Sequence, residues 1–314
     1  MTGDRIDRSR VRTYPIRERR HKVRLADIGT LPKDNSVSAL LESMPHLLGA
    51  EALRGFINAV VAAHARGKPV LAAIGGHVVK SGCTPYLIEL MRRRALTGVA
   101  MNGATAIHDF ELAMTGQTSE DVATGLEDGT FGMVEETGRL MNEAIADGAA
   151  QGLGAGRALG EAIIKADFAH RDASVLAAGI ELDVPVTVHI AIGSDTIHQH
   201  PKADGAALGE TSLNDFELLA GLVAGLGDGG VYINIGSAVV LPEVFLKALT
   251  LARNLGHPVR NFTAANFDMI RHYRPATNVV KRPVLAGGTG YDFTGHHEIM
   301  LPLVTAAILA RLTQ

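Results

Sequence analysis

Hydrophobic residues along this chain of 314 residues form short uninterrupted runs, which alternate with longer stretches whose apolar positions recur every three to four residues. Uninterrupted runs predict strands buried on both faces, and the amphipathic stretches predict helices that cover those faces. The runs predict strands at 69–74, 98–101, 185–192, 231–235, 259–263 and near 278–285. The amphipathic stretches predict helices at 36–44, 50–66, 84–94, 104–114, 132–148, 157–170, 213–226, 242–255 and 299–312. We therefore expect an α/β fold with a doubly wound, mostly parallel sheet.

Two predicted strands end in glycine and lead directly into a predicted helix, at residues 70–82 and 231–240. In a parallel sheet, such a turn places main-chain N–H groups and a helix N-terminus at the carboxyl edge, where phosphates bind. The first turn lacks a complete G-x-G-x-x-G pattern, so a close-packed turn whose lysine faces water is the alternative there. We predict a nucleotide-type cofactor at both turns, bound by Gly75, Gly76, His77, Lys80, Ser81, Gly236 and Ser237.

A third turn, Asn102-Gly103-Ala104, ends another predicted strand, and we expect it to contact the same cofactor. His108 follows Ala104 by one helical turn, so its ring can face the crevice. There it can act as a general base, or hold a substrate amine or hydroxyl. A buried structural histidine is the alternative. Asp109 is a candidate for substrate contact, although adjacent residues on a helix point in different directions.

The densest polar cluster follows the predicted strand at 185–192. We predict that Asp195 fixes the substrate or a ribose, that His198 is an acid–base group, and that His200 contacts the substrate. The H-x-H spacing also suits zinc or another divalent metal, with a third ligand from His189, from His108 or from the distant His296-His297-Glu298. We favour a site without metal, because no tight motif such as H-E-x-x-H is present.

Further candidates lie near the remaining predicted strand ends. Glu243 lies one turn into the helix that follows Gly236-Ser237, and we expect it to contact the substrate. Residues 263–268 and 287–298 are interpreted as loops that converge on the same crevice, because they are rich in small and hydrogen-bonding residues. From these loops we predict cofactor contacts by Thr263 and Ala264 and substrate contacts by Asp268 and His296.

Composition places the chain among ordinary globular proteins, since 46% of residues are hydrophobic, 20% are charged and the formal net charge is −3. This balance favours neither a nucleic-acid partner nor a membrane partner. No segment holds the roughly 18 uninterrupted apolar residues that a membrane span needs, and the N-terminus lacks a secretory pattern. A single cysteine, Cys83, excludes an intramolecular disulfide, so we expect a cytoplasmic protein.

The N-terminal residues differ in charge from the rest of the chain. Between residues 5 and 24 there are nine Arg or Lys residues and two acidic ones. We divide the chain into a basic N-terminal arm at 1–35 and a single α/β nucleotide-binding domain at 36–314. The arm is expected to pack on a neighbouring subunit of a homo-oligomer, a dimer or a tetramer, or to be solvated. An arm that contacts polyanions is the alternative.

Taken in order, the turns resemble those of deoxyhypusine synthase and its bacterial relatives, from about residue 69 to the end of the chain. Residues 76–82 are similar to that family's first nucleotide loop, and Gly236-Ser237 is similar to its later glycine pair. Residues 102–109 are similar to its T-A-G-G-x-E-E-D segment, with His108 in place of an acid. The run TAANFD at 263–268 is similar to its T-A-Q-E-F-D run. The resemblance implies a Rossmann-like sheet with NAD bound between the subunits of a homotetramer.

The chain departs from that family at the catalytic lysine. The family's W-G-K segment, whose lysine forms a covalent imine, has no counterpart here, since Lys281 lies in the sequence N-V-V-K-R-P. We therefore expect an NAD-binding enzyme that acts by hydride transfer on a different small molecule bearing an amine or a hydroxyl. His108 or His198 is its predicted acid–base group. The alternatives are a metal-dependent lyase or hydrolase that uses His189, His198 and His200, and a non-enzymatic nucleotide-sensing or assembly protein.

Overall fold

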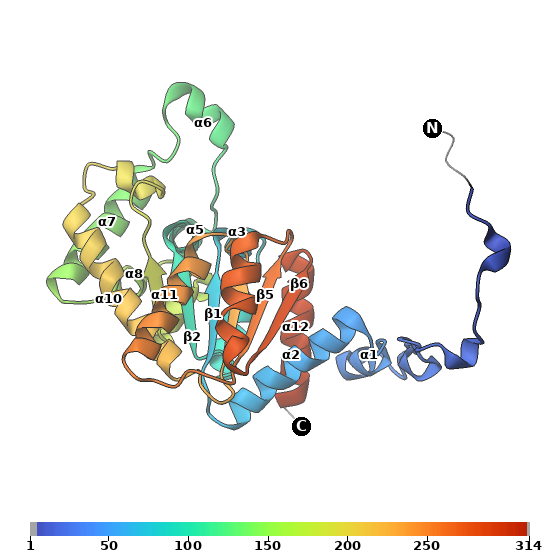
Figure 1. The fold of residues 1–314 in the computed structure, drawn as a ribbon. Coiled ribbons are helices and arrows are strands. Elements are labelled where there is room, and N and C mark those ends of the chain that lie inside the picture. The colour runs from blue at the N-terminus through green and yellow to red at the C-terminus, as the bar shows by residue number, and fades with distance from the viewer. Residues whose placement is uncertain (1–4, 313–314) are drawn as a thin grey trace.

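The six strands of the sheet all run parallel, in the order β3–β2–β1–β4–β5–β6 (Figure 1). The computed structural model describes residues 5–312. The strands are β1 Val70–Ile74, β2 Gly98–Asn102, β3 Val186–His189, β4 Val231–Ile235, β5 Thr263–Asp268 and β6 Thr289–Thr294. After β3 the chain returns to the middle of the sheet and places β4 beside β1, so the strand order reverses between these two strands. This order confirms the predicted α/β sheet of Rossmann-like topology.

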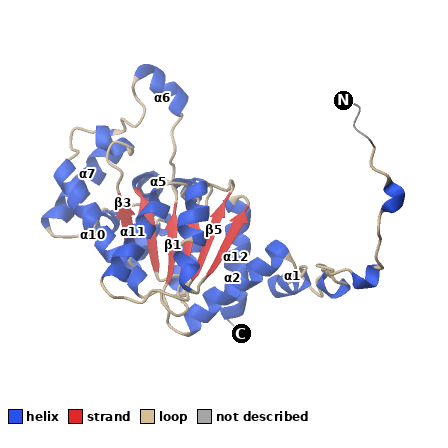
Figure 2. Cartoon of the chain, viewed as in Figure 1, coloured by secondary structure: helices blue, strands red, loops and turns tan. Residues whose placement is uncertain are grey.

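Helices cover both faces of the sheet, and each face has its own hydrophobic core (Figure 2). Along β1, Val70, Ala72 and Ile74 point to one face, while Leu71 and Ala73 point to the other. The first face packs against α2 Leu48–Ala65, α4 Thr84–Arg92, α5 Gly103–Thr115, α8 Ala155–Lys165, α9 Val175–Glu181 and α12 His297–Leu312. The second face packs against the C-terminal half of α10 Gly205–Ala224 and against α11 Val240–Asn254. The sheet is therefore doubly wound, as its apolar strands predict.

The strand predicted at 259–263 is wrong in position. Residues 263–268, which we interpreted as a loop, form the buried strand β5. Polar residues made this segment look like a loop, but the sheet itself provides partners for Asn266. Its side-chain oxygen accepts a hydrogen bond from Asn234 (2.8 Å), and its side-chain nitrogen donates to Asp292 (2.9 Å), each on a neighbouring strand.

The strand predicted near 278–285 is also wrong. A π-helical turn at Pro275–Lys281 and a 3-10 turn at Pro283–Ala286 occupy this part of the chain. The pair Val279-Val280 suggested a strand because β-branched residues favour sheets, but both side chains are buried from a helical turn. The last strand is β6, so 287–298 contains a strand and the start of α12 instead of a loop.

Two segments project from the molecule in different directions, α6 at the top of the view and the N-terminal residues at the right (Figure 1). The helix α6 Val122–Asp128 rises beyond the end of the sheet where the strand arrowheads lie, and the chain then enters α7 Glu135–Ala150. At the right of the view, residues 5–26 extend away from α1 Val37–Ser43, and every one of them is exposed. None of the described helices is long and apolar enough to cross a membrane. The division into an arm and a single domain stays a prediction.

Candidate functional site

The turns that follow β1 and β4 lie against each other where the strand order reverses. The N–H of Gly75 donates to the carbonyl of Ile235 (2.9 Å), and the N–H of Gly236 donates to that of Phe267 (2.9 Å). A Cβ on Gly75 would lie 2.1 Å from the carbonyl oxygen of Gly236, so only glycine fits at position 75. In open α/β sheets, ligands bind in the crevice at this reversal, outside the carboxyl ends of the strands.

The turn after β4 leaves three consecutive main-chain amides without a partner. Within residues 5–312, the N–H groups of Ser237, Ala238 and Val239 donate no hydrogen bond. They precede α11, a helix of 15 residues whose N-terminus carries a partial positive charge. Asn234 fixes this turn by donating to the carbonyl of Ser237 (3.0 Å). A run of open amides before a helix is a binding site for an anion such as a phosphate.

The turn after β1 begins the short helix α3 Gly76–Lys80. Gly76 lies against the ring of His108, since a Cβ at this position would be 3.2 Å from Cδ2 of that ring. Both His77 and Lys80 are exposed beside it. Ser81, by contrast, donates to the carbonyl of Val78 (3.2 Å) at the end of its own helix, so the hydroxyl predicted to meet the cofactor is already bonded.

The N-terminus of α5, after β2, is filled by side chains of the protein itself. Asn102 Oδ1 accepts from the Thr105 N–H (2.9 Å), and Asp195 accepts from the N–H of Ala104. The Asp195 carboxylate covers Gly103 so closely that a Cβ there would lie 1.9 Å from Oδ2. The Asp195 carboxylate therefore lies over the turn at which we predicted cofactor contacts by Asn102, Gly103 and Ala104.

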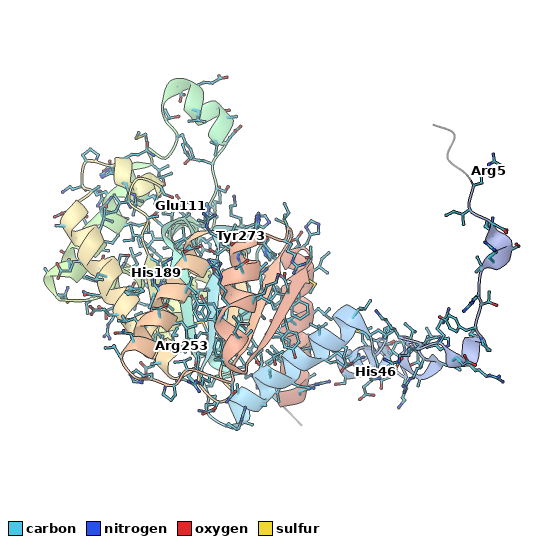
Figure 3. All side chains as sticks on the ribbon, viewed as in Figure 1. Arg5, His46, Glu111, His189, Arg253 and Tyr273 are labelled. Carbon is cyan, nitrogen blue, oxygen red and sulfur yellow. The ribbon has the colours of Figure 1, made fainter. Side chains whose placement is uncertain are left out.

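A cavity of about 860 Å³ adjoins the N-terminus of α5 and lies between α5, α6, α7 and the loop that holds Asp195. Its wall includes Lys80, His108, Glu111, Thr118, Thr137 and Asp195. Glu111 is labelled in Figure 3 and lies at the end of the sheet from which α6 rises. His108 belongs both to the cavity wall and to the contact with Gly76, so it connects the cavity with the crevice at the strand reversal.

A chain of hydrogen bonds fixes the ring of His108. Thr118 Oγ1 donates to Glu111 Oε2 (2.5 Å) and therefore accepts from His108 Nδ1 (2.8 Å). Thr137 Oγ1 donates to the other oxygen of Glu111 (3.0 Å). Burial, and then the charge of Lys80, lower the pKa of His108 to about 4. The ring is thus neutral near pH 7 with its proton on Nδ1, which leaves the Nε2 lone pair free to accept a proton.

Asp195 and His198 form a second polar pair at the cavity. His198 Nδ1 accepts from the N–H of Gly193 (3.0 Å), so its neutral ring carries the proton on Nε2. This Nε2 lies 3.9 Å from Asp195 Oδ2, and in the described part of the chain neither atom has a hydrogen-bond partner although both are buried. Burial raises the pKa of Asp195 to about 6 and lowers that of His198. An unpaired donor and an unpaired acceptor at this spacing suit a hydroxyl group, which accepts from one and donates to the other.

Asp109 does not face the cavity, so its predicted contact with the substrate is wrong. It is fully buried and accepts from the Ser174 hydroxyl (2.5 Å) and from the N–H groups of Val175 (2.8 Å) and Leu176 (3.1 Å), which begin α9. Burial raises its pKa to about 6. The carboxylate is a helix cap.

The three histidines of the metal-dependent alternative have separate partners. His189 is buried with Nε2 3.0 Å from Thr187 Oγ1, and burial lowers its pKa to about 4. His200 is bonded to Glu135 (3.1 Å), which also corrects its predicted contact with the substrate. Among residues 5–312, no group of three His, Cys, Asp or Glu side chains is placed to hold a metal ion.

The other predicted contacts have varied surroundings in the structure. Thr263 and Ala264 begin β5, at the end of the sheet opposite to its carboxyl edge, so they cannot contact a cofactor bound there. The carboxylate of Glu243 pairs with Lys247 and Arg274 and accepts from Asn278 (2.8 Å). His296 is an exposed residue, 3.7 Å from its neighbour Glu298. Asp268 does end β5 at the carboxyl edge.

Sequence reasoning missed three residues that the fold brings to this region, Glu111, Thr118 and Thr137, and it named His297 only within the alternative metal site. Glu111 lies three residues after His108 on one helix, and this spacing alone could have indicated the pair. His297 is buried against Gly236, and its ring centre lies 5.6 Å from that of His77. Its Nε2 is 3.4 Å from the carbonyl oxygen of Phe267, and its Nδ1 is buried without a partner in the described chain.

No known family model matches the chain, and no curated protein matches its sequence. Solved structures nevertheless share the fold. The conserved LOR/SDH protein from Methanococcus maripaludis S2 aligns with a TM-score of 0.51 at 12% identity, over 93% of this chain and 74% of its own. AgrE, solved with ornithine and NAD+, aligns with a TM-score of 0.53 at 11% identity, over 86% of this chain.

This chain spans only 34% of the length of AgrE. A protein from Entamoeba histolytica named as a deoxyhypusine synthase aligns with a TM-score of 0.50 at 11% identity, over 88% of this chain and 94% of its own. At these identities the likeness concerns the fold. The chain therefore belongs to the class of doubly wound α/β proteins whose strand order reverses between β1 and β4, and AgrE, which shares this fold over the part aligned, was solved with NAD+.

Proposed function

We propose that this protein is an enzyme that binds NAD in the crevice where the turns after β1 and β4 meet. The observation that carries the proposal is the run of open amides at Ser237, Ala238 and Val239, placed at the start of α11 beside Gly75, where a Cβ would clash with the carbonyl oxygen of Gly236. The pyrophosphate of a dinucleotide matches this site, because its charge complements the amides and the helix dipole.

The cavity beside the crevice is the proposed place for a small polar substrate with an amine or a hydroxyl. Asp195 Oδ2 and His198 Nε2 would hold a hydroxyl of the substrate or of the cofactor ribose, which would provide the partners that both atoms lack. His108 would accept the proton of the reacting hydroxyl or amine at Nε2, since its Nδ1 is already bonded to Thr118. NAD would supply the hydride acceptor.

Binding and turnover test the proposal separately. We expect the purified protein to bind NAD+ in a calorimetric titration and His108→Ala to retain the wild-type affinity. The variant should lose turnover by about 10²–10⁴-fold, the usual contribution of a general base. Turnover is followed as NADH absorbance with a panel of small amines and alcohols.

The matched control is His257→Ala, which changes an exposed histidine beyond the end of α11, away from the crevice. It should leave both binding and turnover unchanged. A wild-type protein that binds no dinucleotide would remove the proposal as a whole. Full turnover by His108→Ala would remove only the role of His108.

A further inference from the structure

The basic arm carries an unusual combination of charge and exposed apolar side chains. We define the arm as residues 5–26, with nine Arg or Lys residues, two acidic residues and a net charge of +7. Its exposed large apolar residues are Ile6, Val11, Tyr14, Ile16, Val23 and Leu25, each at least 56% accessible. Two one-turn 3-10 helices, Arg8–Arg10 and Ile16–Glu18, and the start of a third at Leu25 give the arm local structure. Such apolar exposure is typical of a surface that another molecule covers.

A second surface of the same molecule complements the arm in both respects. We define the acidic lobe as residues 119–147, which comprise α6, the loop after it and most of α7. It holds eight Asp or Glu residues and a single basic one, a net charge of −7. It also exposes Val122, Leu126, Met133 and Val134, each at least 44% accessible, of which Val122 and Val134 also line the rim of the cavity. The lobe therefore offers carboxylates and apolar side chains to a partner that is basic and partly apolar.

The two surfaces lie on opposite sides of one molecule (Figure 1). The chain is anchored just after the arm, where the N–H of His46 donates to the carbonyl of Asp27 (3.0 Å) and the N–H of Thr30 to that of Ser43 (2.8 Å). From this anchor the arm points away from its own sheet, and Arg5 lies at its far end (Figure 3). To reach its own lobe, the arm would have to reverse direction and cross the whole molecule.

We infer that the arm of one copy docks on the acidic lobe of a second copy, and that the second arm docks reciprocally on the first lobe. A closed two-fold arrangement satisfies both pairs of surfaces at once. The charges specify the partner and speed its approach, while the apolar side chains supply the area removed from water. This interface does not depend on the proposed NAD site.

Charge reversal with rescue tests the pairing. The triple change Arg17→Glu, Arg19→Glu and Arg20→Glu alters the arm, and Glu127→Lys with Asp128→Lys alters the lobe. Each set alone should raise the dissociation constant of the dimer by about ten-fold or more, since like charges facing each other cost several kcal/mol. Combining both sets should restore much of the affinity. Lys165→Glu, an exposed change outside both surfaces, is the control and should have no effect.

A pair of single-cysteine variants distinguishes exchange between copies from folding back. Cys83 is the only native cysteine and is buried, so added thiols react selectively. Mixing Arg19→Cys with Leu126→Cys should give a disulfide-linked heterodimer under mild oxidation. Such a link forms only when the arm of one molecule reaches the lobe of another.

Three results would overturn the inference. The first is a protein that is monomeric in sedimentation at every concentration. The second is an oligomer that is unchanged by both charge reversals. The third is an arm that copurifies with nucleic acid and is released from it by the arm reversal alone, which would make a polyanion the partner.

Discussion

The helices that follow β2 and β4 both begin just after a glycine turn at the carboxyl edge, yet their N-termini differ. At α5, Asp195 and Asn102 accept hydrogen bonds from the first turn, and the Asp195 carboxylate supplies the negative charge. At α11, the amides from Ser237 to Val239 donate no hydrogen bond within residues 5–312, and Glu243, the acidic residue of the first turn, is paired with Lys247 and Arg274. The same local pattern has therefore produced one filled and one open anion site.

This difference divides the proposed active region into two halves. On the β4 side, the main chain presents open amides and the helix dipole, which suit the phosphates of a cofactor. On the β2 side, the helix N-terminus is already neutralised, and side chains such as His108 and Asp195 face a cavity. In the proposed function, main-chain groups bind the cofactor and side chains transfer protons, so the two halves should respond to different substitutions.

The largest expected effect is on the main-chain half. Gly75→Ala places a Cβ 2.1 Å from the Gly236 carbonyl oxygen and forces the two turns apart. We expect NAD affinity to fall at least ten-fold, because each hydrogen bond to a charged group contributes about 1.5–3 kcal/mol. Unfolding should also become easier by about 1–3 kcal/mol, as is typical of overpacking. Calorimetric titration and urea unfolding measure these two changes.

Gly209→Ala is the matched control, since a Cβ there meets nothing within 4 Å inside α10. It should stabilise the helix by up to about 1 kcal/mol and leave NAD affinity unchanged. If Gly75→Ala binds NAD as tightly as wild type, the abutting turns do not hold the phosphates, and the proposed division into two halves fails.

How much of this contrast the sequence could predict depends on how far apart along the chain the interacting residues lie. The turns after β1 and β4 were visible because an apolar run that ends in glycine is a local signal. The filling of α5 was not visible, because Asp195 comes 92 residues after Gly103 and meets it only when β3 lies beside β2. β5 was misplaced for a similar reason, since the partners of Asn266 lie on other strands.

On the β2 side, where side chains face the cavity, Asp195 should have an effect of intermediate size on stability. Burial raises its pKa from 3.8 to about 6, so the folded state holds its proton more tightly than the unfolded state. The resulting stability is fully present below about pH 4 and is lost as the pH rises through 6. A shift of two units corresponds to about 3 kcal/mol. Asp195→Asn keeps an acceptor for the amide of Ala104 but cannot ionise. Its free energy of unfolding, relative to that of wild type, should therefore rise by that amount between pH 4 and 7.

Urea unfolding at several pH values measures the gain of Asp195→Asn. Asp147→Asn, at an exposed position on α7, is the control, and its stability should follow that of wild type across the range. Parallel curves for Asp195→Asn and wild type would show that Asp195 is not desolvated at the start of α5. In that case the contrast between the two helix N-termini would disappear.

The smallest expected effect concerns the proton position on His108. In wild type, Thr118 donates to Glu111 and so accepts from His108 Nδ1, which leaves Nε2 without a proton. In Glu111→Leu the Thr118 hydroxyl becomes free to donate to Nδ1, so the ring proton should move to Nε2. A single hydrogen bond contributes about 1 kcal/mol, so the tautomer ratio should change several-fold. Ring ¹⁵N shifts measured by NMR report this ratio without any substrate.

Glu136→Gln changes another carboxylate of the cavity wall and should leave the shifts as they are. If Nε2 already carries the proton in wild type, Thr118 does not orient His108 as a base, and the side-chain half needs a different acid–base group.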